Sequence, residues 1–268
     1  MNNTSCIQKS MGQPSGGSSQ EKSGKYFYAV MDGATKHEIY GPIGIDGGMV
    51  YLVSDGRLCA VVSDMSNKKI RPERRHLAAH QGVLKRLMEG NAVLPMVFGI
   101  IEDNAQAIQT ILTRNQDALL KQLHRVAGKV EMGVNVRWDV PDIFEYFVNT
   151  HTELRVARDQ FFGACRVPNH EKKIEIGRMF DTILNENRQI HAEKVEKVLA
   201  SRCVEIKSNP VRNEREVIKL ACLIEREAQK EFEAGVFEAA QLFDDNFAFD
   251  FNGPCAPHNF VGIDLLSE

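Results

Sequence analysis

Two histidines, His76 and His80, stand four residues apart in a segment whose pattern predicts a helix. That spacing places both imidazoles on one helix face, as two zinc ligands on a helix would be. The intervening residues Leu77, Ala78 and Ala79 do not include the glutamate that a metalloprotease uses as its base. The sequence offers no evident third ligand, so we interpret both residues as ordinary histidines on a helix surface.

The segment Gly41–Gly48 is rich in glycine, as phosphate-binding loops are. It lacks the Gly-Lys-Ser/Thr ending that contacts phosphate and magnesium. The β-prone run Met49–Val53 also follows it at the point where a helix should begin. We therefore expect a plain connection between two strands.

Acidic residues are concentrated late in the chain, where they could form a carboxylate pair or a calcium site. They are Glu225, Glu227, Glu231, Glu233, Asp244 and Asp245. A calcium loop needs oxygen ligands at alternate positions around a tight glycine turn, and this pattern is missing. We expect a solvated helix face that could steer a basic partner.

Candidate nucleophiles are few, because no serine lies in a Gly-x-Ser-x-Gly elbow. Cys203 has no assignable base, and Cys255 has only His258 near it in sequence. Proximity in sequence does not by itself create a reactive thiolate. The sequence therefore predicts a protein that is not an enzyme and that has no catalytic, metal-binding or cofactor-binding residues.

Two apolar segments remain as candidates for contact with a partner. The C-terminal residues 253–263 contain two prolines, which fix φ and remove two backbone donors. They predict a stiff extension that docks on its own domain or on a partner, with Pro254, Pro257, Phe260 and Val261 as contact residues.

The second segment is Leu94-Pro-Met-Val-Phe-Gly99, which is expected to lie in a strand. The period of a strand would place Met96 and Phe98 on one face and Val97 on the other, so that one face could meet a partner. The expected contact residues are Leu94, Pro95, Met96 and Phe98. Packing of the same side chains in the core is the competing interpretation.

The elements that must position these residues begin after a disordered tail. Residues 1–24 are rich in Ser, Gly, Gln and Lys and offer too little apolar surface to offset the entropy of ordering. We then expect a mixed α/β domain over residues 25–129. Its predicted elements are a strand at 26–30, a hairpin of 49–54 and 58–63 turning at Asp55-Gly56, a helix at 72–89 with Leu77, Leu84, Leu87 and Met88 as its buried stripe, a strand at 93–100 and a long helix at 104–127.

The second half, residues 130–268, reads as an ordered series of strands and helices. The predicted elements are an alternating strand ending at Trp138, a Pro141-led helical piece, a long helix through Ile176–Val198, a strand at 204–207, a continuous apolar strand at 217–224, a helix face from Ile224 to Phe243 and a strand at 247–251. This β-α-β-β-α-β order is typical of the ferredoxin-like fold and makes the whole chain α+β.

Composition limits the remaining classes of function. The net charge of −3 gives no general attraction to nucleic acid or to an anionic membrane. The longest apolar run, Ala92–Ile101, is interrupted by Pro95 and Gly99 and has about half the length of a spanning helix. The six cysteines form no close pair, and the N-terminus lacks a signal-peptide pattern. We expect a cytoplasmic protein with reduced thiols.

Three segments together resemble the gas vesicle protein F/L family (GvpF/GvpL). They are His80–Gly99, which is similar to that family's His…LPxxFG block, Lys129–Trp138, which is similar to the strand opening its C-terminal domain, and Gly253–Val261, which is similar to its Gly-Pro-Trp-Pro-Pro-Tyr-x-Phe-Val ending. The last segment departs from the family pattern, because Cys255, Ala256 and His258 stand where the family has Trp, Pro and Tyr.

The resemblance implies a mixed α/β N-terminal domain and a modified ferredoxin-like C-terminal domain. It also implies a non-catalytic accessory role in gas vesicle formation, at the vesicle, in contact with the small hydrophobic shell protein and other accessory proteins. An alternative is a ferredoxin-like regulatory module that binds a small ligand. RNA binding on the open sheet has little support, because Arg137 and Trp138 point to opposite faces of their strand.

Overall fold

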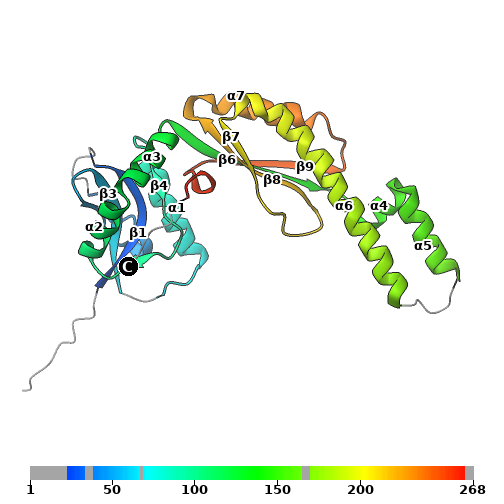
Figure 1. Ribbon diagram of the computed structural model, residues 1–268, viewed down its shortest axis with the longest axis horizontal. Helices are drawn as coiled ribbons and strands as arrows, with labels where there is room; N and C mark the ends of the chain where they lie inside the picture. The colour runs from blue at the N-terminus through cyan, green and yellow to red at the C-terminus, as the bar shows by residue number, and fades with distance from the viewer. Residues whose placement is uncertain (1–22, 34–38, 67–68, 165–169, 263–268) are drawn as a thin grey trace, which may run out of the picture.

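The structure is a computed structural model that describes residues 23–33, 39–66, 69–164 and 170–262. Residues 1–22 of the predicted disordered tail, 1–24, lie outside the described residues, whereas Ser23 and Gly24 belong to the first strand. Within these ranges the chain forms two sheets and seven α-helices, which confirms the α+β class. Figure 1 shows how these elements are arranged.

The first sheet is antiparallel and has the strand order β2-β3-β1-β4, with β5 also paired to β1. Its strands are β1 (Ser23–Asp32), β2 (Val50–Ser54), β3 (Leu58–Ser66), β4 (Leu94–Pro95) and β5 (Ile101–Glu102). The predicted hairpin is confirmed, because β2 pairs with β3 around Asp55-Gly56. The Asp55 carboxylate accepts the backbone N–H groups of Arg57 and Leu58, and Gly56 takes a φ of +99° that few other residues adopt.

Three helices pack on the two faces of this sheet. They are α1 (Arg74–Met88), α2 (Ala105–Arg114) and α3 (Gln116–Val126). Side chains alternate along β1, but an irregularity between Phe27 and Ala29 shifts the alternation by one residue. As a result, Tyr26 and Tyr28 join the α1 core, whereas Phe27 and Val30 pack with α2 and α3.

Three predictions for this half need correction. The long helix at 104–127 is interrupted at Asn115, whose backbone leaves helical geometry and whose side chain donates to the Ile111 carbonyl. The strand at 93–100 is confined to β4, and the chain rejoins the sheet only as β5. Leu77 is 40% exposed, because the buried stripe of α1 runs through His76 and His80 instead.

The second sheet has the antiparallel order β7-β8-β6-β9. Its strands are β6 (Lys129–Trp138), β7 (Glu205–Ser208), β8 (Glu216–Glu225) and β9 (Phe247–Cys255). The predicted β-α-β-β-α-β order is therefore confirmed, and the continuous apolar strand, β8, is central as expected.

Four helices belong to this half. They are α4 (Ile143–Thr150), α5 (Thr152–Ala164), α6 (His170–Leu199) and α7 (Gln229–Ala240). Helix α5 occupies a stretch for which no element was predicted. The helix predicted from Ile224 to Phe243 is shorter than expected. Ile224 still belongs to β8, and α7 ends at Ala240. Short 3₁₀ turns occur at Ile45–Gly47, Ala200–Arg202, Arg226–Ala228 and His258–Phe260.

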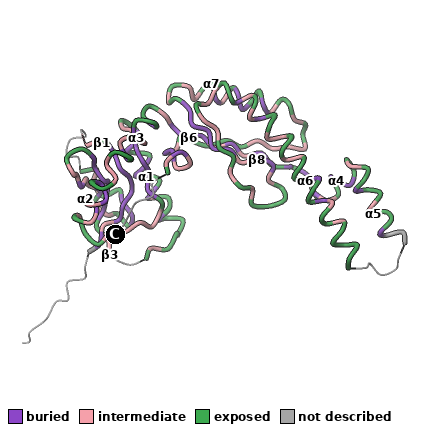
Figure 2. The backbone as a smooth tube through the Cα atoms, in the orientation of Figure 1, coloured by how far each residue is buried: buried purple, intermediate pink, exposed green. Residues whose placement is uncertain are grey.

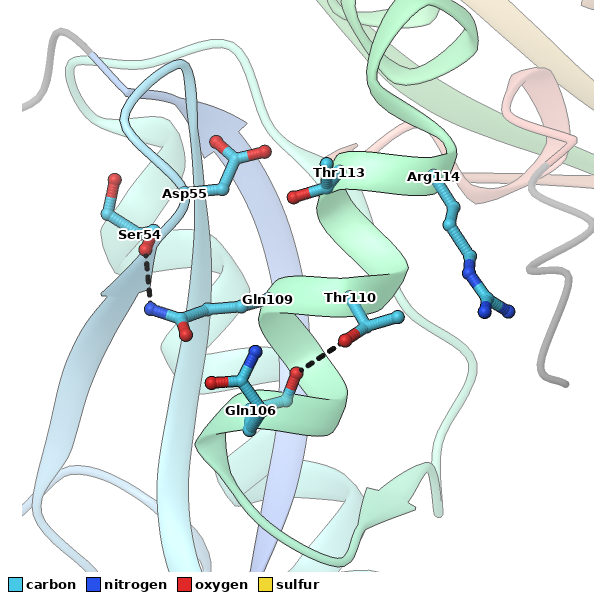
Figure 3. A pocket seen from close by; sticks show the side chains of 7 residues that line it. All are labelled: Ser54, Asp55, Gln106, Gln109, Thr110, Thr113 and Arg114. Carbon is cyan, nitrogen blue, oxygen red and sulfur yellow. Dashed lines mark hydrogen bonds between the residues drawn. The ribbon is translucent and has the colours of Figure 1, made fainter.

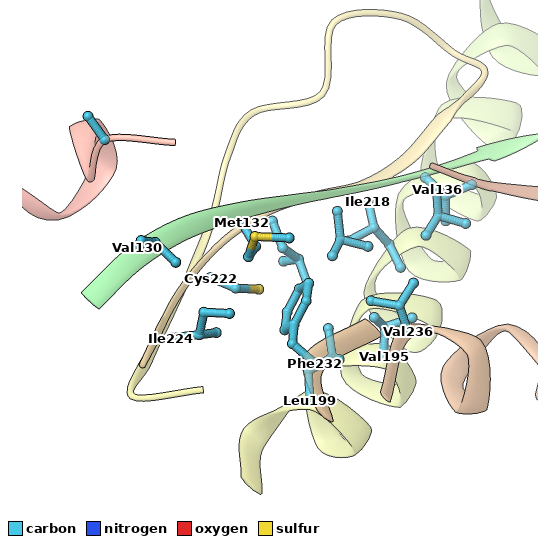
Figure 4. Close-up of a cluster of buried hydrophobic side chains, with 14 of the residues drawn as sticks. Val130, Met132, Val136, Val195, Leu199, Ile218, Cys222, Ile224, Phe232 and Val236 are labelled. Atoms are coloured by element: carbon cyan, nitrogen blue, oxygen red, sulfur yellow. The ribbon is translucent and has the colours of Figure 1, made fainter. Parts of the chain in front are cut away.

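Helices α6 and α7 cover one face of the second sheet. The side chains that fill this layer come from alternate positions of β6 and β8 and from both helices (Figure 4), among them Met132, Cys222, Leu199 and Phe232. Buried residues, purple in Figure 2, lie in both sheets, and the largest apolar cluster includes residues of both. None of the helices in the described ranges is long and apolar enough to cross a membrane.

Candidate partner-binding surface

The C-terminal segment, residues 253–262, docks on its own chain, which is one of the two outcomes expected for it. Phe260 is completely buried and packs on Ala221 and Leu223, on the face of the second sheet that α6 and α7 leave open. The Nζ atom of Lys207 lies 5.3 Å from the centre of the Phe260 ring. Phe260 therefore behaves as a core residue of this face.

Hydrogen bonds hold this segment from three directions. The Glu131 carboxylate accepts the Asn259 backbone N–H at 2.8 Å and its side-chain Nδ2 at 2.6 Å. The Lys207 ammonium donates to the Asn259 carbonyl at 2.8 Å. Arg125 of α3 donates to the Phe260 carbonyl at 3.0 Å. The C-terminal segment thus links the second sheet to a helix of the first half.

Glu131 was not identified by sequence reasoning, because the alternation of β6 assigns it to the solvated face. Its exposed fraction is only 9%, since the C-terminal segment covers it. Burial raises the pKa of its carboxyl group, while the two bonds from Asn259 act in the opposite direction. No local sequence signal marks this role, which depends on a contact 128 residues away.

The predicted contact residues of the C-terminal segment differ in exposure. Pro254 is exposed and Val261 is partly buried, whereas Pro257 and Phe260 are buried. Val261 packs against the cluster formed by β1, α2 and α3. Partner contact by these four residues stays a prediction, and in this structure Phe260 contacts its own sheet.

The segment at 94–99 lies mainly in the core. Leu94 and Met96 are 0% and 3% exposed and pack with α2 and α3, and Pro95 is buried as well. Phe98 belongs to the opposite, α1 side, where its ring lies 6.0 Å from that of Tyr26. The expectation that Met96 and Phe98 share a strand face is therefore wrong, because the strand ends at Pro95 and the chain turns before Gly99. Their contact with a partner stays a prediction.

The prediction that His76 and His80 lie on the helix surface is wrong, because both are in the buried stripe of α1. The Tyr26 hydroxyl lies 3.0 Å from His80 Nδ1, and the His80 ring stacks on Tyr28 with centroids 5.6 Å apart. His76 Nδ1 lies 3.1 Å from the Arg71 carbonyl oxygen. Within the described part of the chain, no group of three or more His, Cys, Asp or Glu side chains could hold a metal ion.

The electrostatics of His80 agree with a structural role. Burial lowers the pKa of His80 to about 4, and His258 of the C-terminal segment acts in the same direction. Burial also raises the pKa of Tyr26 to about 12. Both groups are therefore neutral near pH 7 and bond to each other as uncharged partners.

The Cys255–His258 pair lacks the properties of a catalytic dyad. Burial raises the pKa of the Cys255 thiol and lowers the pKa of His258. Both shifts oppose the thiolate–imidazolium pair that nucleophilic catalysis needs. For Cys203, the main influence is a hydrogen bond with the Cys222 thiol, which lowers the pKa of Cys203.

The remaining candidates also have structural interpretations. The Gly41–Gly48 segment connects β1 to β2, and its Ile45 N–H donates to the Tyr28 hydroxyl at 2.9 Å. The acidic residues Glu225, Glu227 and Glu231 are exposed, as a solvated face requires.

A polar groove of about 550 Å³ lies between α2 and the β2–β3 turn (Figure 3). Its lining residues are Ser54, Asp55, Gln106, Gln109, Thr110, Thr113 and Arg114. Gln109 closes one side by donating to the Ser54 carbonyl at 2.9 Å. The lining contains amides, hydroxyls and one ion of each sign, without a nucleophile beside a base.

Comparison with known proteins gives one consistent family. The family described as "Gas vesicle synthesis protein GvpL/GvpF" matches residues 24–262. Gas vesicle protein F of Streptomyces sp. (strain CB03234) is 27% identical over 224 residues, covering 84% of this chain and 92% of that protein. Gas vesicle protein F of Dolichospermum flosaquae is 25% identical over 224 residues, covering 82% and 91%.

Solved structures share the fold. The crystal structure of GvpF from Microcystis aeruginosa matches with a TM-score of 0.75 and 23% identity, over 90% of this chain and 99% of that one. GvpF from Anabaena sp. PCC7120 matches over the same shares, with a TM-score of 0.73 and 23% identity. The family match spans both sheets and the C-terminal segment and supports an accessory role in gas vesicle formation. The chain belongs to the gas vesicle synthesis protein GvpL/GvpF family.

Proposed function

We propose that this chain is a non-catalytic accessory protein that binds the small hydrophobic shell protein of the gas vesicle, together with other accessory proteins, during nucleation or growth. It acts in the cytoplasm, in association with the vesicle. The observation that carries the proposal is the family match over residues 24–262, which includes every described strand except the first residue of β1.

The mechanism is protection by contact. A small apolar shell protein exposes surfaces and strand edges that aggregate unless they are covered. This chain offers apolar side chains on its surface, including Val97 at 73% exposure and Phe237 at 63%. It also offers strand edges to which an extended segment could pair. Such contacts would hold the shell protein at the growth site until it joins the vesicle wall.

The test is co-expression of the full chain with the shell protein, followed by purification through a tag on this chain. The proposal expects a soluble complex that contains both proteins. An unrelated aggregation-prone peptide of similar size, expressed in the same way, is the control. Shell protein that remains entirely in the insoluble fraction would contradict the proposal.

A second candidate function, regulation by a small ligand, has one observation in its favour. A groove of about 480 Å³ lies on the open side of the second sheet. It is lined by Asn209, Pro210, Val211, Arg212, Lys219 and Asn259. Two cationic side chains and two amides suit a small anion. A thermal-shift screen of small anions on dialysed protein tests this function, because a true ligand raises the melting temperature.

A further inference from the structure

The outer edge of β9 is the longest unpaired strand edge in the described part of the chain. β9 is the terminal strand of its sheet, has nine residues and pairs only with β6. The opposite edge strand, β7, has four residues. In the first sheet, β4 and β5 have two residues each, and β2 is bridged by Gly41. Proteins usually shorten or cover such edges, because the unpaired N–H and C=O groups can bind a strand of another chain. A long open edge is therefore a candidate binding site.

The register of β9 identifies which backbone groups face outward. The Asp139 N–H donates to the Asn246 carbonyl at 2.7 Å, one pair before Trp138↔Phe247 in the β6–β9 register. In an antiparallel ladder, hydrogen-bonded pairs alternate with pairs whose amides point away. The alternation directs the N–H and C=O groups of Phe249 and Phe251 away from β6. These are the groups that an added strand would use.

An exposed aromatic pair lies beside this edge. Phe251 of β9 and Phe237 of α7 are 37% and 63% exposed, and their rings meet edge to face with centroids 6.2 Å apart. Among the residues whose side-chain exposure the structure describes, they are the only two aromatic ones in the set of large exposed hydrophobic residues. Aromatic anchors next to free main-chain groups are what strand addition uses, since the backbone supplies affinity and the side chains supply specificity.

The charges around the aromatic pair indicate which charge the bound segment carries. The acidic residues that flank it in sequence are Glu233 and Glu238 on α7, Asp244 and Asp245 in the α7–β9 turn, and Asp250 on β9. Asp250 is held by Arg137 at 2.7 Å and Glu238 by Arg202 at 2.6 Å, so that the remaining three acids give this side its negative charge. A segment that carries Lys or Arg beside its apolar residues would complement it.

We propose that the outer edge of β9, with Phe237 and Phe251 as anchors, binds an extended apolar segment of the shell protein that is flanked by basic residues. This site rests on the proposed function, because it specifies where and how the shell protein is held. The segment adds as a further strand beyond β9 and covers the aromatic pair.

Two substitutions at Phe251 distinguish the contribution of its ring from that of its backbone N–H. Phe251→Thr removes the ring and keeps both the outward N–H and a strand-forming residue. Phe251→Pro removes the ring and also the outward N–H, which β6 does not use. Ile190→Ser, at a 52% exposed apolar position on α6, is the matched control. Circular dichroism and the melting temperature establish that each variant is folded.

The assay is co-purification of the shell protein with each full-length variant. We expect Phe251→Thr combined with Phe237→Ser to retain about tenfold less shell protein than wild type, Phe251→Pro to retain less than Phe251→Thr, and Ile190→Ser to match wild type. Equal retention by all folded variants would overturn the site while leaving the proposed function intact. Absence of shell protein from the wild-type complex would instead overturn the proposed function, and the site with it. A wild-type dimer that Phe251→Pro dissociates would identify a second copy as the occupant and would also overturn the inference.

Discussion

At the scale of single residues, the clearest difference from sequence reasoning is the burial of polar side chains. His76 and His80 were expected on a helix surface, and the alternation of β6 assigns Glu131 to the solvated face, yet each is at most 9% exposed. Periodicity assigns a residue to a face, but it does not say which long-range segment covers that face. The Tyr26 hydroxyl is the hydrogen-bond partner of His80, and Asn259 covers Glu131 and donates to its carboxylate. These partners lie 54 and 128 residues away, beyond any local pattern.

The buried His80 predicts a pH-dependent stability. Its folded pKa of about 4 is lower than the ordinary 6.5, so the unfolded chain binds the proton first as pH falls. The stabilisation is present above pH 6.5 and is lost as the pH falls towards 4, by roughly 3 kcal/mol in total. Urea unfolding at several pH values between 7 and 4 measures it.

A substitution isolates this contribution. His80→Phe keeps an aromatic ring but removes the titrating group, and it leaves the Tyr26 hydroxyl without its imidazole partner. We expect a lower free energy of unfolding at pH 7, by about 1–3 kcal/mol, and a weaker loss of stability on acidification. The exposed His124 of α3 provides the matched control, His124→Phe. An unchanged pH profile in His80→Phe would contradict the assignment.

At the scale of elements, sequence signals succeeded where local chemistry determines the structure. Asp55-Gly56 fixes the hairpin, and the alternation of Met132, Val134 and Val136 fixes the buried face of β6. They failed where few apolar positions were available. Helix α5 buries Leu154 and Phe161 but leaves Val156 47% exposed, so its apolar stripe was too sparse to recognise.

The C-terminal segment gives a test at this scale. Phe260→Ala should lower the free energy of unfolding by about 3 kcal/mol, because it leaves a cavity on Ala221 and Leu223. Phe237→Ala, the same substitution at a 63% exposed position on α7, should change it by less than about 1 kcal/mol. Equilibrium unfolding in urea compares the two. Unchanged stability in Phe260→Ala would mean that this residue does not serve as core.

At the scale of the whole molecule, one apolar cluster joins the two sheets, and the C-terminal segment ties them together through Glu131 and Arg125. The fold class and the β-α-β-β-α-β order could be predicted from sequence, because each rests on local periodicity. The junction could not, since it brings α3, β6 and the end of the chain to one place. The division into domains at residue 129 stays a prediction.

Long open surfaces on this frame are consistent with a protein that works by contact. Helix α5 and the first half of α6 extend past the second sheet (Figure 1), and the β9 edge lies on the far side of that sheet from β7. Separate surfaces of this kind would allow the shell protein and other accessory proteins to bind at the same time.

Whether this chain holds the gas vesicle shell protein can be measured from the composition of the soluble complex. Tagged wild-type chain is purified from cells that co-express the shell protein, and the molar ratio of the two proteins is measured by quantitative mass spectrometry. We expect shell protein in a reproducible ratio to this chain and well above the level retained by the tag alone. A ratio no greater than that background would contradict the proposed function.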